Sequence, residues 1–465
     1  MNLKELLYNV NIIKIKADLE IEVKSIQWKV SGIIINENMK DKVAILKNEP
    51  KQLYSQYILV DDARLAFSII CANYYGNPSK KIKVIGVTGT NGKTTTTYLI
   101  KQLLEKCFNT KVGLMGTICN MIGDEVVKEG KTDLTTSPSN ITQYLLKEMV
   151  NNECEYCVME VTSHSLAWKR AYSIDYDIGV FTNIGRDHLD FHKTIENYVD
   201  AKSKLFPMCK KVVGNKDDEW YNMVMKNCKC KPYTISIKDK NVNLYAENIC
   251  LYKDKVVFDV VENNLRINTF IQMPGEFSVY NALSAIACLR LEGANLKDIC
   301  KYLPLCKCPK GRAEKIETNS DFDIYIDYAV TPDSLKCILN TFKPFVKGRL
   351  VLLFGCGGNK DIGKRQLMGE IASELADFII VTSDNPRYED KNKIIKDIIK
   401  GIKNNSYIMI SDRKEAIRYA IKNHQPNDLI LLCGKGHEDY QIIGGKKIHM
   451  DEREIIEEIL NSGYN

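Results

Sequence analysis

The sequence has no apolar run long enough to cross a bilayer, which takes about 20 consecutive apolar residues. Its opening segment, MNLKELLYNV, lacks the apolar core and the small-residue cleavage site of a signal peptide. It also lacks low-complexity segments and blocks of like charge, and the net charge of +6 is spread along 465 residues. These absences predict a cytoplasmic protein that is not inserted in a membrane. The small positive charge, spread along the chain, indicates a weak attraction for anionic ligands and no nucleic-acid-binding surface.

Zinc-ligand spacing is missing as well, although the chain has 16 cysteines. Cys154 and Cys157 form one C-x-x-C pair, and two C-x-C pairs begin at Cys228 and Cys306. No second pair at a suitable distance or neighbouring histidine completes a zinc site. Other cysteines fall in apolar segments, where a small thiol packs well. We expect free, reduced cysteines, and metal binding by one of the pairs stays open as the alternative.

The length and composition predict a globular protein of several domains. Hydrophobic residues make up 45% of the chain and charged residues 27%, which is ordinary for a soluble protein. A single hydrophobic core rarely serves so long a chain. The first 80 residues contain a β-like stretch at Ile33–Ile35 and a candidate helix at Arg64–Tyr75. The segment Gly76–Ser79 has the composition of a turn and a linker.

Short apolar runs alternate with helical patterns over the rest of the chain. This alternation predicts two successive, mostly parallel sheets covered by helices, and therefore an α/β fold. We predict a small α/β N-terminal domain (1–80), a central nucleotide-binding domain (81–306) and a C-terminal Rossmann-like domain (307–465). The predicted strands are Lys83–Val87, Cys157–Val161, Ile178–Ile184, Val212–Gly214, Ile324–Ile326, Leu350–Phe354, Phe378–Val381, Ile408–Ile410 and Leu429–Leu432. Arg365–Leu375 and Glu452–Leu460 are predicted helices.

A glycine-rich segment follows the strand at Lys83–Val87 and precedes a helical pattern that runs to Leu104. It departs from the common phosphate-loop pattern G-x-x-x-x-G-K-[ST] because Val87 stands at the first glycine position. Its glycines let backbone N–H groups converge on phosphate oxygens, and a lysine and a threonine follow to meet phosphate and Mg²⁺. The alternative is a glycine turn with a solvated lysine. The residues that we predict to bind ATP here are Gly89, Thr90, Asn91, Gly92, Lys93, Thr94 and Thr95.

The segment TGTNGKTTT resembles the Mur ligase family, and further motifs follow in that family's order from about residue 64 to the C-terminus. These motifs are Met159–His164, Phe181–Asp190, Gly275–Ala282, Gly311–Arg312, Asp327–Asp333, Asp384–Arg387 and Gly434–Glu438. The resemblance implies an ATP-dependent ligase that activates a carboxylate as an acyl phosphate and joins it to an amine. It implies ATP and Mg²⁺ as cofactors and small-molecule substrates. We expect a monomer.

Two polar residues end apolar strands behind the phosphate loop, where open α/β sheets place ligand-binding groups. Glu160 and His188 could therefore form a second Mg²⁺ site, in addition to the contact of Thr94 with Mg²⁺; otherwise they are a strand-end carboxylate and a loop histidine. The sequence around Lys202 is that of an ordinary helix with solvated lysines. The resemblance places Lys202 where the family carbamylates a lysine with CO₂, which creates an anion able to hold Mg²⁺ near the γ-phosphate. We predict that Lys93, Glu160, His188 and Lys202 are catalytic.

The resemblance also implies the remaining substrate contacts. Asn281 and Arg312 match family positions near the adenine and phosphates, and Asp327 matches the ribose-binding acid. The sugar-peptide acceptor is expected at Thr135, Thr136, Thr162 and Arg170. The incoming amino acid is expected at Lys360, Asp384, Asn385, Pro386, Arg387, Gly434 and Glu438.

Arg387 predicts the identity of the amino acid. In family members that use meso-diaminopimelate, an Asp-Asn-Pro-Arg motif presents its arginine to the second carboxylate of that substrate. A guanidinium binds a carboxylate through two parallel hydrogen bonds and repels the bare ammonium end of lysine. Glu438 matches the carboxylate that holds the substrate's ammonium. The resemblance thus implies addition of meso-diaminopimelate to UDP-N-acetylmuramoyl-L-alanyl-D-glutamate in peptidoglycan precursor synthesis.

The sequence departs from the family pattern at three places. Val330 stands where the motif usually has histidine, and Lys360 replaces a usual arginine, which keeps the charge but loses the fork. The N-terminal domain is short, and Ser25–Trp28 lies where the family has an Asp-Ser-Arg segment for the uridine end. Two alternatives follow: a ligase that uses a different acceptor, such as a secondary-metabolite peptide, and an ATP-binding pseudoenzyme that acts as a scaffold.

Overall fold

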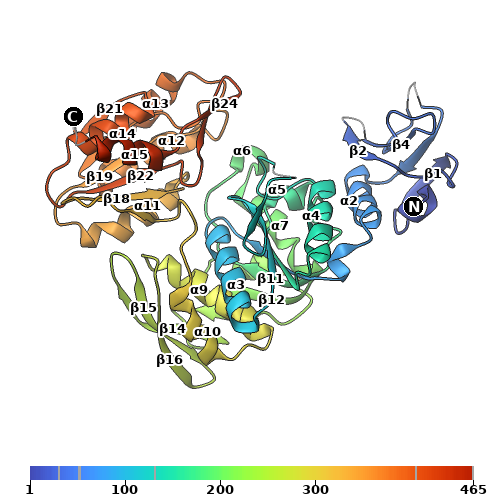
Figure 1. The fold of residues 1–465 in the computed structure, drawn as a ribbon, viewed down its shortest axis with the longest axis horizontal. Coiled ribbons are helices and arrows are strands. Elements are labelled where there is room, and N and C mark those ends of the chain that lie inside the picture. The colour runs from blue at the N-terminus through green and yellow to red at the C-terminus, as the bar shows by residue number, and fades with distance from the viewer. Residues whose placement is uncertain (30–31, 51–53, 130–131, 404–405, 463–465) are drawn as a thin grey trace.

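The computed structural model describes residues 1–29, 32–50, 54–129, 132–403 and 406–462. The described strands form sheets of five, eleven and six strands and one two-stranded hairpin. Figure 1 shows three bodies that follow one another along the chain, from the blue N-terminal body through the green and yellow centre to the red C-terminal body. The three-domain α/β architecture predicted from the sequence is confirmed. None of the described helices has both the length and the apolar composition of a membrane span.

The N-terminal body is a five-stranded sheet with two helices. The strand order is β1-β5-β4-β3-β2, with β4 and β5 parallel and the other pairs antiparallel. The elements are α1 (Leu3–Leu6), β1 (Ile12–Lys16), β2 (Ile26–Lys29), β3 (Gly32–Ile35), β4 (Val43–Leu46), β5 (Tyr57–Val60) and α2 (Ala63–Tyr74). The strand predicted at Ile33–Ile35 and the helix predicted at Arg64–Tyr75 are both present. The other four strands were not predicted.

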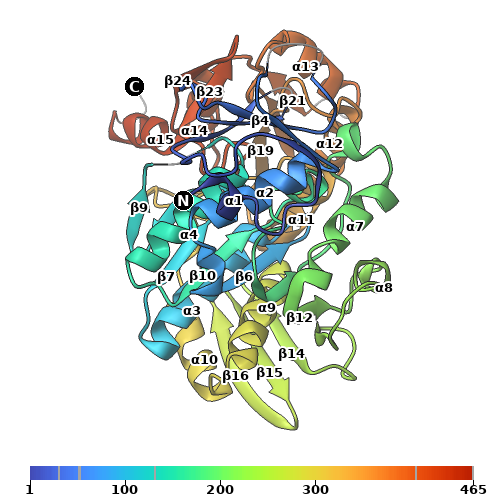
Figure 2. The ribbon, with the colours of Figure 1, turned by 90° about the vertical axis from the view of Figure 1, so that its right-hand side faces the viewer.

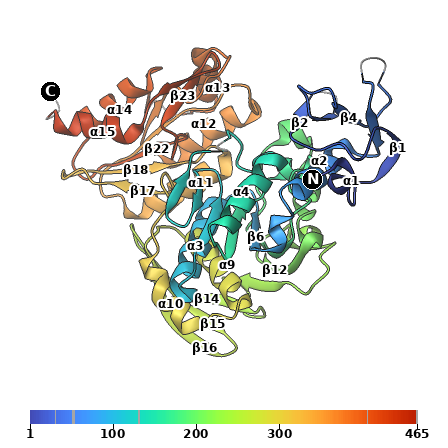
Figure 3. The same cartoon turned by 45° about the vertical axis from the view of Figure 1, so that its right-hand side comes forward.

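Helix α2 joins this body to the central one. Figures 2 and 3 show α2 beside α4 (Ser139–Asn151), and the two helices pack together. Asp62, which caps the start of α2, forms an ion pair with Lys169 at 2.6 Å. The Ser68 hydroxyl accepts a hydrogen bond from the Ser173 backbone N–H at 3.1 Å. The predicted turn at 76–79 follows α2, where Asn77 precedes a short 3₁₀ helix at Pro78–Lys80.

The central sheet has a parallel core. Strand β6 (Lys83–Thr88) lies between β11 (Tyr176–Phe181) and β10 (Tyr156–Glu160). Beyond β10 the parallel run ends with β7 (Val112–Met115). Beyond β11 it continues through β12 (Cys209–Asn215) and β13 (Tyr233–Ser236) to β14 (Leu244–Leu251). Alternate residues of β6 face opposite layers. Ile85 packs in a core with α3 (Lys93–Phe108) and α9 (Phe277–Leu291), whereas Val84 packs in one with α4 and α7 (Ile195–Ser203).

Antiparallel strands extend both edges of this sheet. Strands β15 (Val256–Glu262) and β16 (Leu265–Ile271) follow β14 at one edge, and β8 (Asn120–Ile122) and β9 (Glu125–Val127) follow β7 at the other. These extensions were not predicted from the sequence. The remaining central elements are α5 (Ser163–Ala167), α6 (Leu189–His192), α8 (Tyr221–Val224), α10 (Leu296–Tyr302) and 3₁₀ turns at Phe206–Met208 and Leu303–Leu305.

The C-terminal body is a six-stranded sheet covered on both faces. The strand order is β17-β18-β22-β19-β20-β21, with β17 antiparallel and the others parallel. The strands are β17 (Glu314–Ile316), β18 (Asp323–Asp327), β19 (Leu350–Phe354), β20 (Phe378–Val381), β21 (Tyr407–Met409) and β22 (Leu429–Cys433). Helices α11 (Pro332–Phe342), α12 (Gly363–Leu375) and α13 (Lys391–Ile399) cover one face, and α14 (Arg413–Lys422) and α15 (Glu452–Asn461) cover the other. A hairpin of β23 (Tyr440–Ile443) and β24 (Lys446–His449) stands apart from the sheet. The strands and helices predicted for this half are confirmed.

Candidate active site

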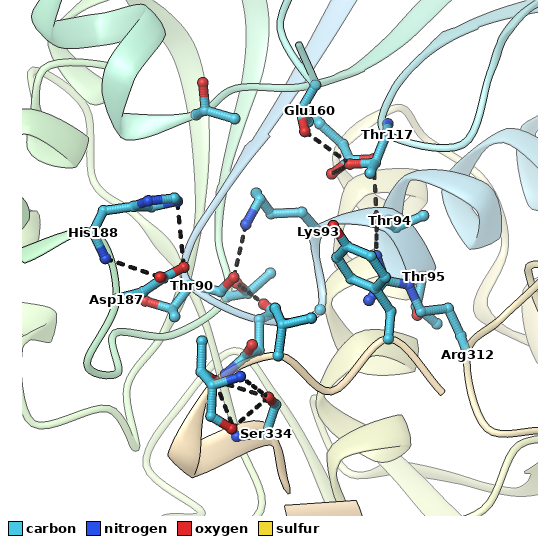
Figure 4. A pocket seen from close by; sticks show the side chains of 18 of the residues that line it. Thr90, Lys93, Thr94, Thr95, Thr117, Glu160, Asp187, His188, Arg312 and Ser334 are labelled. Carbon is cyan, nitrogen blue, oxygen red and sulfur yellow. Dashed lines mark hydrogen bonds and ion pairs between the residues drawn. The ribbon is translucent and has the colours of Figure 1, made fainter. Parts of the chain in front are cut away.

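A cavity of about 960 Å³ lies between the central and C-terminal domains, and Figure 4 shows part of its lining. The phosphate loop, the carboxyl ends of the central strands and loops of the C-terminal sheet all border it. The predicted residues that line it are Thr90, Asn91, Gly92, Lys93, Thr94, Thr95, Thr135, Thr136, Glu160, Thr162, Arg170, His188, Asn281, Arg312, Asp327, Lys360, Asp384, Asn385, Arg387, Gly434 and Glu438. Gly89, Lys202 and Pro386 are not among the lining residues. Their proposed roles, like those of the lining residues, stay predictions.

The phosphate loop needs its glycines for steric reasons. Gly92 has φ +82° and directly precedes α3, so its backbone is in the left-handed region. A Cβ at Gly92 would lie 2.4 Å from the amide oxygen of Asn281, and one at Gly89 would lie 1.8 Å from the hydroxyl of Thr182. The loop is thus pressed against its neighbours while the N-terminus of α3 faces the cavity, as in an anion-binding site.

Lys93 folds back on this loop. Its ammonium donates to the carbonyl oxygens of Gly89 at 2.9 Å and Thr90 at 2.7 Å. Removal from water lowers the pKa of Lys93, while Glu160 and Asp187 oppose that shift. The ammonium of Lys93 therefore lies at the phosphate loop, where the oxygens of a phosphate group could replace the two carbonyl oxygens as its hydrogen-bond acceptors.

Glu160 is the centre of a hydrogen-bond network at the end of β10. Its Oε1 accepts from the Thr94 hydroxyl at 3.0 Å and from the Thr117 backbone N–H at 2.8 Å, and its Oε2 accepts from the Thr117 hydroxyl at 3.0 Å. Figure 4 shows Thr94, Thr117 and Glu160 together above Lys93. Carboxylate and hydroxyl oxygens are ligands that suit Mg²⁺, which keeps waters and substrate phosphates as its other ligands. The Thr94–Glu160 pair fits that ion.

His188 lies on the other side of Lys93 from Glu160 in Figure 4. Its backbone N–H donates to Asp187 Oδ1 at 2.9 Å, and its Nε2 is 3.3 Å from Asp187 Oδ2. Burial lowers the pKa of His188 to about 4, against the opposing charge of Asp187, so the imidazole is neutral at pH 7. Within the described ranges, no group of three or more His, Cys, Asp or Glu side chains is arranged to hold a metal. A joint metal site of Glu160 and His188 stays a prediction.

Two further histidines pack beside His188. The His164 ring centroid is 4.6 Å from that of His188, and His192 Nε2 is 3.0 Å from the Ser163 hydroxyl. Burial lowers the pKa of His164, and it lowers the pKa of His192 to about 4. The cluster of His164, His188 and His192 is therefore neutral near pH 7. Sequence reasoning assigned a role to only one of its members.

Hydroxyl groups join the predicted acceptor residues into one patch. The Thr136 hydroxyl donates to the Glu160 carbonyl at 2.9 Å and lies 3.1 Å from the Thr162 hydroxyl. The backbone N–H of Thr162 donates to the Thr136 hydroxyl at 3.0 Å. The hydroxyls of Thr135 and Thr117 are 3.1 Å apart. Nε of Arg170 is buried without a hydrogen-bond partner in the described chain, and burial lowers the pKa of its guanidinium. This cation faces a cavity that could supply an anionic partner.

The residues predicted to bind the nucleotide come from both domains. Arg312 Nη2 donates to the Thr94 hydroxyl at 3.1 Å, which carries a contact from the C-terminal side to the phosphate loop, and the guanidinium lies 4.8 Å from the Tyr328 ring centroid. Asn281 accepts from the Thr96 hydroxyl at 3.3 Å. Asp327 accepts from the Ala313 N–H at 2.7 Å, and burial raises its pKa to about 6 despite Arg312.

Val330, one of the departures from the family pattern, also lines the cavity, and its carbonyl accepts from Lys364 Nζ at 2.8 Å. Only its backbone therefore makes a polar contact here. The ammonium of Lys364 thereby lies in the part of the cavity where family members usually have a histidine side chain.

The predicted amino-acid residues line the part of the cavity that the C-terminal domain forms. Arg387 has φ +56°, and its Nη1 donates to the Gly358 carbonyl at 3.0 Å. Lys360 lines the same space, and its pKa is lowered first by burial and then by the charge of Arg387. Two cations that approach one another in a partly desolvated cavity favour an anionic ligand between them.

Glu438 supplies a negative charge to the same part of the cavity. Its Oε2 accepts from Asn385 Nδ2 at 2.8 Å and from Lys435 Nζ at 2.5 Å. Burial raises the pKa of Glu438, and Lys435 is the largest opposing influence. Asp384 is buried, and its Oδ2 has no hydrogen-bond partner among the described residues. This part of the cavity therefore offers both cationic and anionic groups, as a zwitterionic amino acid requires.

The sequence matches the Mur ligase middle domain at residues 87–289 and the Mur ligase glutamate ligase domain at residues 311–436. It is 49% identical to the UDP-N-acetylmuramoyl-L-alanyl-D-glutamate–2,6-diaminopimelate ligase of Caldanaerobacter subterraneus subsp. tengcongensis, over 93% of this chain and 90% of that protein. It is 41% identical to the protein of the same name from Clostridium tetani, over the whole of both chains.

The chain belongs to the Mur ligase family. It is an ATP-dependent ligase of the amide-bond-forming type. A solved structure of a UDP-N-acetylmuramoyl-L-alanyl-D-glutamate–2,6-diaminopimelate ligase has a TM-score of 0.63 and 29% identity, and the match covers 90% of this chain and 87% of that one. The match to the Clostridium tetani protein spans the N-terminal domain as well, although that domain lacks a recognisable Asp-Ser-Arg segment.

Several residues of this Mur ligase site were not predicted. Thr117 follows β7 in the segment Met115–Thr117, a strand-end position that could have indicated a ligand-binding group. Asp187 and His164 stood inside motifs but had no assigned role. Lys435, which is fully buried beside Glu438, also had none. All 16 cysteines are free, and the thiols of Cys228 and Cys230 are 3.7 Å apart.

Proposed function

We propose that this Mur ligase adds meso-diaminopimelate to UDP-N-acetylmuramoyl-L-alanyl-D-glutamate in peptidoglycan precursor synthesis. The enzyme would act in the cytoplasm as a monomer. The observation that carries the proposal is one cavity lined by the phosphate loop, by the threonines and arginine predicted to bind the acceptor, and by Arg387 and Glu438. The names of the similar proteins from Caldanaerobacter and Clostridium support the same substrates.

The arrangement suits carboxylate activation followed by amide formation. ATP would bind over the loop, with Lys93 against its β- and γ-phosphates and Arg312 beside them. The terminal carboxylate of the acceptor, held by Arg170, Thr136 and Thr162, would attack the γ-phosphorus and release ADP. The amino group of diaminopimelate would then attack the acyl carbon of the acyl phosphate. Collapse of the tetrahedral intermediate would expel phosphate and leave the amide.

Thr94 and Glu160 would be the first ligands of Mg²⁺, which supplies charge stabilisation for phosphoryl transfer when it is bound. The hydroxyl of Thr94 and the carboxylate of Glu160 are 3.0 Å apart and bear only oxygen donors. The neutral imidazole of His188 and a carbamate on Lys202 would be further ligands.

Support for the Lys202 carbamate comes from its surroundings. A carbamate forms when a neutral amine attacks CO₂, so that one N–C bond forms and one proton leaves. Lys202 is buried, and its pKa is lowered far below the usual value, first by burial and then by Lys93. The amine is therefore poised in the form that reacts with CO₂.

The first alternative is a Mur ligase that uses a different acceptor, and the short N-terminal domain is its main support. The second is an ATP-binding scaffold without activity. The joint presence of Lys93, Glu160, His188 and Lys202 argues against a scaffold, which has no need of all four.

One experiment separates these functions. The enzyme is incubated with ATP, Mg²⁺ and meso-diaminopimelate or L-lysine, in the presence of UDP-N-acetylmuramoyl-L-alanyl-D-glutamate or the same acceptor without UDP. Products are identified by mass spectrometry, and ADP release is followed in parallel. Acceptor-dependent ADP release with the diaminopimelate adduct of the UDP acceptor supports the proposal. Equal kcat/KM for both acceptors would favour a different acceptor, and no acceptor-dependent ADP release would favour the scaffold.

A further inference from the structure

Lys435 is a buried charge for which the proposed chemistry has no use. It lies between β22 and β23, and its side chain is fully buried. It is not among the residues that line the cavity, whereas Glu438, Asn385 and Tyr440 are. Burial of an ammonium group is costly unless partners satisfy it. Its partners therefore indicate what the charge is for.

The ammonium of Lys435, together with the Ile442 backbone N–H, determines the orientation of the Asn385 amide. It lies 2.9 Å from Asn385 Oδ1, and the Ile442 backbone N–H donates to the same oxygen at 2.9 Å. A lysine ammonium can only donate, so the oxygen of the amide must face it. The amide nitrogen, Nδ2, consequently points to Glu438 Oε2, to which it donates at 2.8 Å.

The same ammonium determines which oxygen of Glu438 faces the ligand. Lys435 Nζ and Asn385 Nδ2 both donate to Oε2. Within the described chain no hydrogen bond reaches Oε1, so that oxygen is the one left for a donor in the cavity. A substrate ammonium would thus contact a carboxylate whose rotation is restrained by the two hydrogen bonds to Oε2.

The network continues to the residue expected to read the far carboxylate. The backbone of Ile442 donates to Asn385 and accepts from the Arg387 N–H at 2.9 Å, and the Gly444 N–H donates to the Arg387 carbonyl at 2.6 Å. Lys435, Asn385, Ile442 and Arg387 are therefore joined in one path. The path connects the anionic and cationic ends of the amino-acid site through the β23–β24 hairpin.

We propose that Lys435 is a positioning residue for the amino-acid substrate, which turns Oε1 of Glu438 toward the substrate's ammonium and fixes its distance from Arg387. The proposal rests on the proposed function, in which Glu438 and Arg387 bind the two ends of the amino acid. Lys435 itself touches neither the substrate nor the reacting atoms.

The test uses the full-length enzyme with Lys435→Met, which keeps the length of the side chain but removes the charge and the hydrogen bonds. The KM for diaminopimelate should rise by about 10- to 100-fold, because one charged hydrogen-bonded partner is lost. The KM values for ATP and for the acceptor should stay within about twofold, because their residues lie outside the path. Lys446→Met is the matched control, since Lys446 is an exposed lysine on the same hairpin and should leave all KM values unchanged.

A double-mutant cycle distinguishes positioning from a general structural effect. If Lys435 acts through Glu438, Lys435→Met should add little to the KM effect of Glu438→Gln. Fully additive effects, or equal rises in the KM values for all three substrates, would overturn the proposal. The cycle also covers a poorly folded Lys435→Met variant, because misfolding would lower activity in both backgrounds.

The pH profile gives a further readout. The charged or titratable groups that influence Glu438 include Lys435, Asp384, Tyr328 and Tyr440, and Lys435 is the one that lowers its pKa. In Lys435→Met the pKa of Glu438 should rise, so Glu438 becomes protonated at a higher pH than in the wild type. As the pH is lowered, the KM for diaminopimelate should therefore begin to increase at a higher pH in the variant. An unchanged profile would contradict the proposal. Failure of the proposed function is distinct, because the wild type itself would then show no turnover with diaminopimelate.

Discussion

Lys93 and Lys202 donate hydrogen bonds to one shared acceptor, the carbonyl oxygen of Gly89, at 2.9 and 2.7 Å. The first comes from the start of α3 and the second from the end of α7, on opposite faces of the central sheet. An ammonium group on Lys202 would be repelled by that of Lys93, and this charge lowers the pKa of Lys202 further below the value set by burial. Conversion of Lys202 to an anion would turn this repulsion into attraction.

Replacement of Lys202 by alanine should leave the enzyme nearly inactive if that anion is a carbamate. Short carboxylic acids should restore part of the activity by occupying the vacated position. The measurements are ADP release with and without added acid, and carbon-13 NMR of the wild type equilibrated with labelled CO₂. Because the reactive form is the neutral amine, carbamate occupancy should fall as the pH falls through the lowered pKa of Lys202.

The control for this variant is Lys204→Ala, since Lys204 is half-exposed at the end of the same helix and forms an ion pair with Asp200. It should show wild-type activity and need no added acid. Ordinary activity in Lys202→Ala, or a wild-type spectrum without the labelled carbamate signal, would contradict the carbamate proposal.

Lys93→Ala should lower ATP turnover by about a hundredfold or more and leave the fold intact, because it removes a transition-state charge and no core volume. Phosphate release and circular dichroism are measured on the same sample. Lys106→Ala is the matched control, because Lys106 is an exposed lysine in the last turn of the same helix. Substantial turnover in Lys93→Ala would mean that this loop is not the catalytic one.

The phosphate loop could be predicted because a local pattern of glycines, lysine and threonine encodes it between a strand and a helix. The edge strand β16 could not, because its residues at 265–268 are mostly exposed and lack a continuous apolar run. The burial of Lys202 escaped a prediction from composition. It depends on a contact with Gly89, 113 positions away in the sequence, and only the resemblance pointed to that lysine.

The amino-acid end of the site shows the same limit. Asn385 and Lys435 lie in two separate sequence motifs, and neither motif reveals the hydrogen bond between them, which joins residues 50 positions apart. A lysine beside a glycine in a loop has the pattern of a solvated side chain. Its hydrogen bond to Asn385, from a distant segment, is the contact that the sequence does not reveal.

The pair of Arg413 and Glu452 should dominate the stability of the C-terminal domain. Both side chains are fully buried, their groups are 2.8 Å apart, and Arg413 also donates to the carbonyl oxygens of Ser383 and Cys433. Glu452→Ala leaves a guanidinium buried without its counter-charge, which typically costs about 3–5 kcal/mol. The measurement is the free energy of unfolding of this domain in urea. Glu457→Ala, an exposed change in the same helix, should cost less than about 0.5 kcal/mol, and equal costs for the two variants would refute the prediction.

Arg387 should be the main source of selectivity for meso-diaminopimelate over L-lysine. The two amino acids share a carbon chain with a distal amine and differ in the carboxylate beside that amine. With diaminopimelate, Arg387 gains an anionic partner in a cavity that Lys360 also makes cationic. With lysine, the same guanidinium faces a cation and stays unpaired.

Loss of one charged hydrogen-bonding partner typically costs about 2–5 kcal/mol, and about 1.4 kcal/mol corresponds to a tenfold change. The wild type should therefore prefer diaminopimelate by at least about a hundredfold in kcat/KM. Arg387→Ala should lose most of its rate with diaminopimelate and narrow the gap to lysine, because Lys360 is a point charge without the fork. Arg418→Ala, which removes an arginine from α14 that pairs with Glu415, should change neither value. A wild type that prefers lysine, or an Arg387→Ala variant with unchanged selectivity, would show that another residue reads the carboxylate.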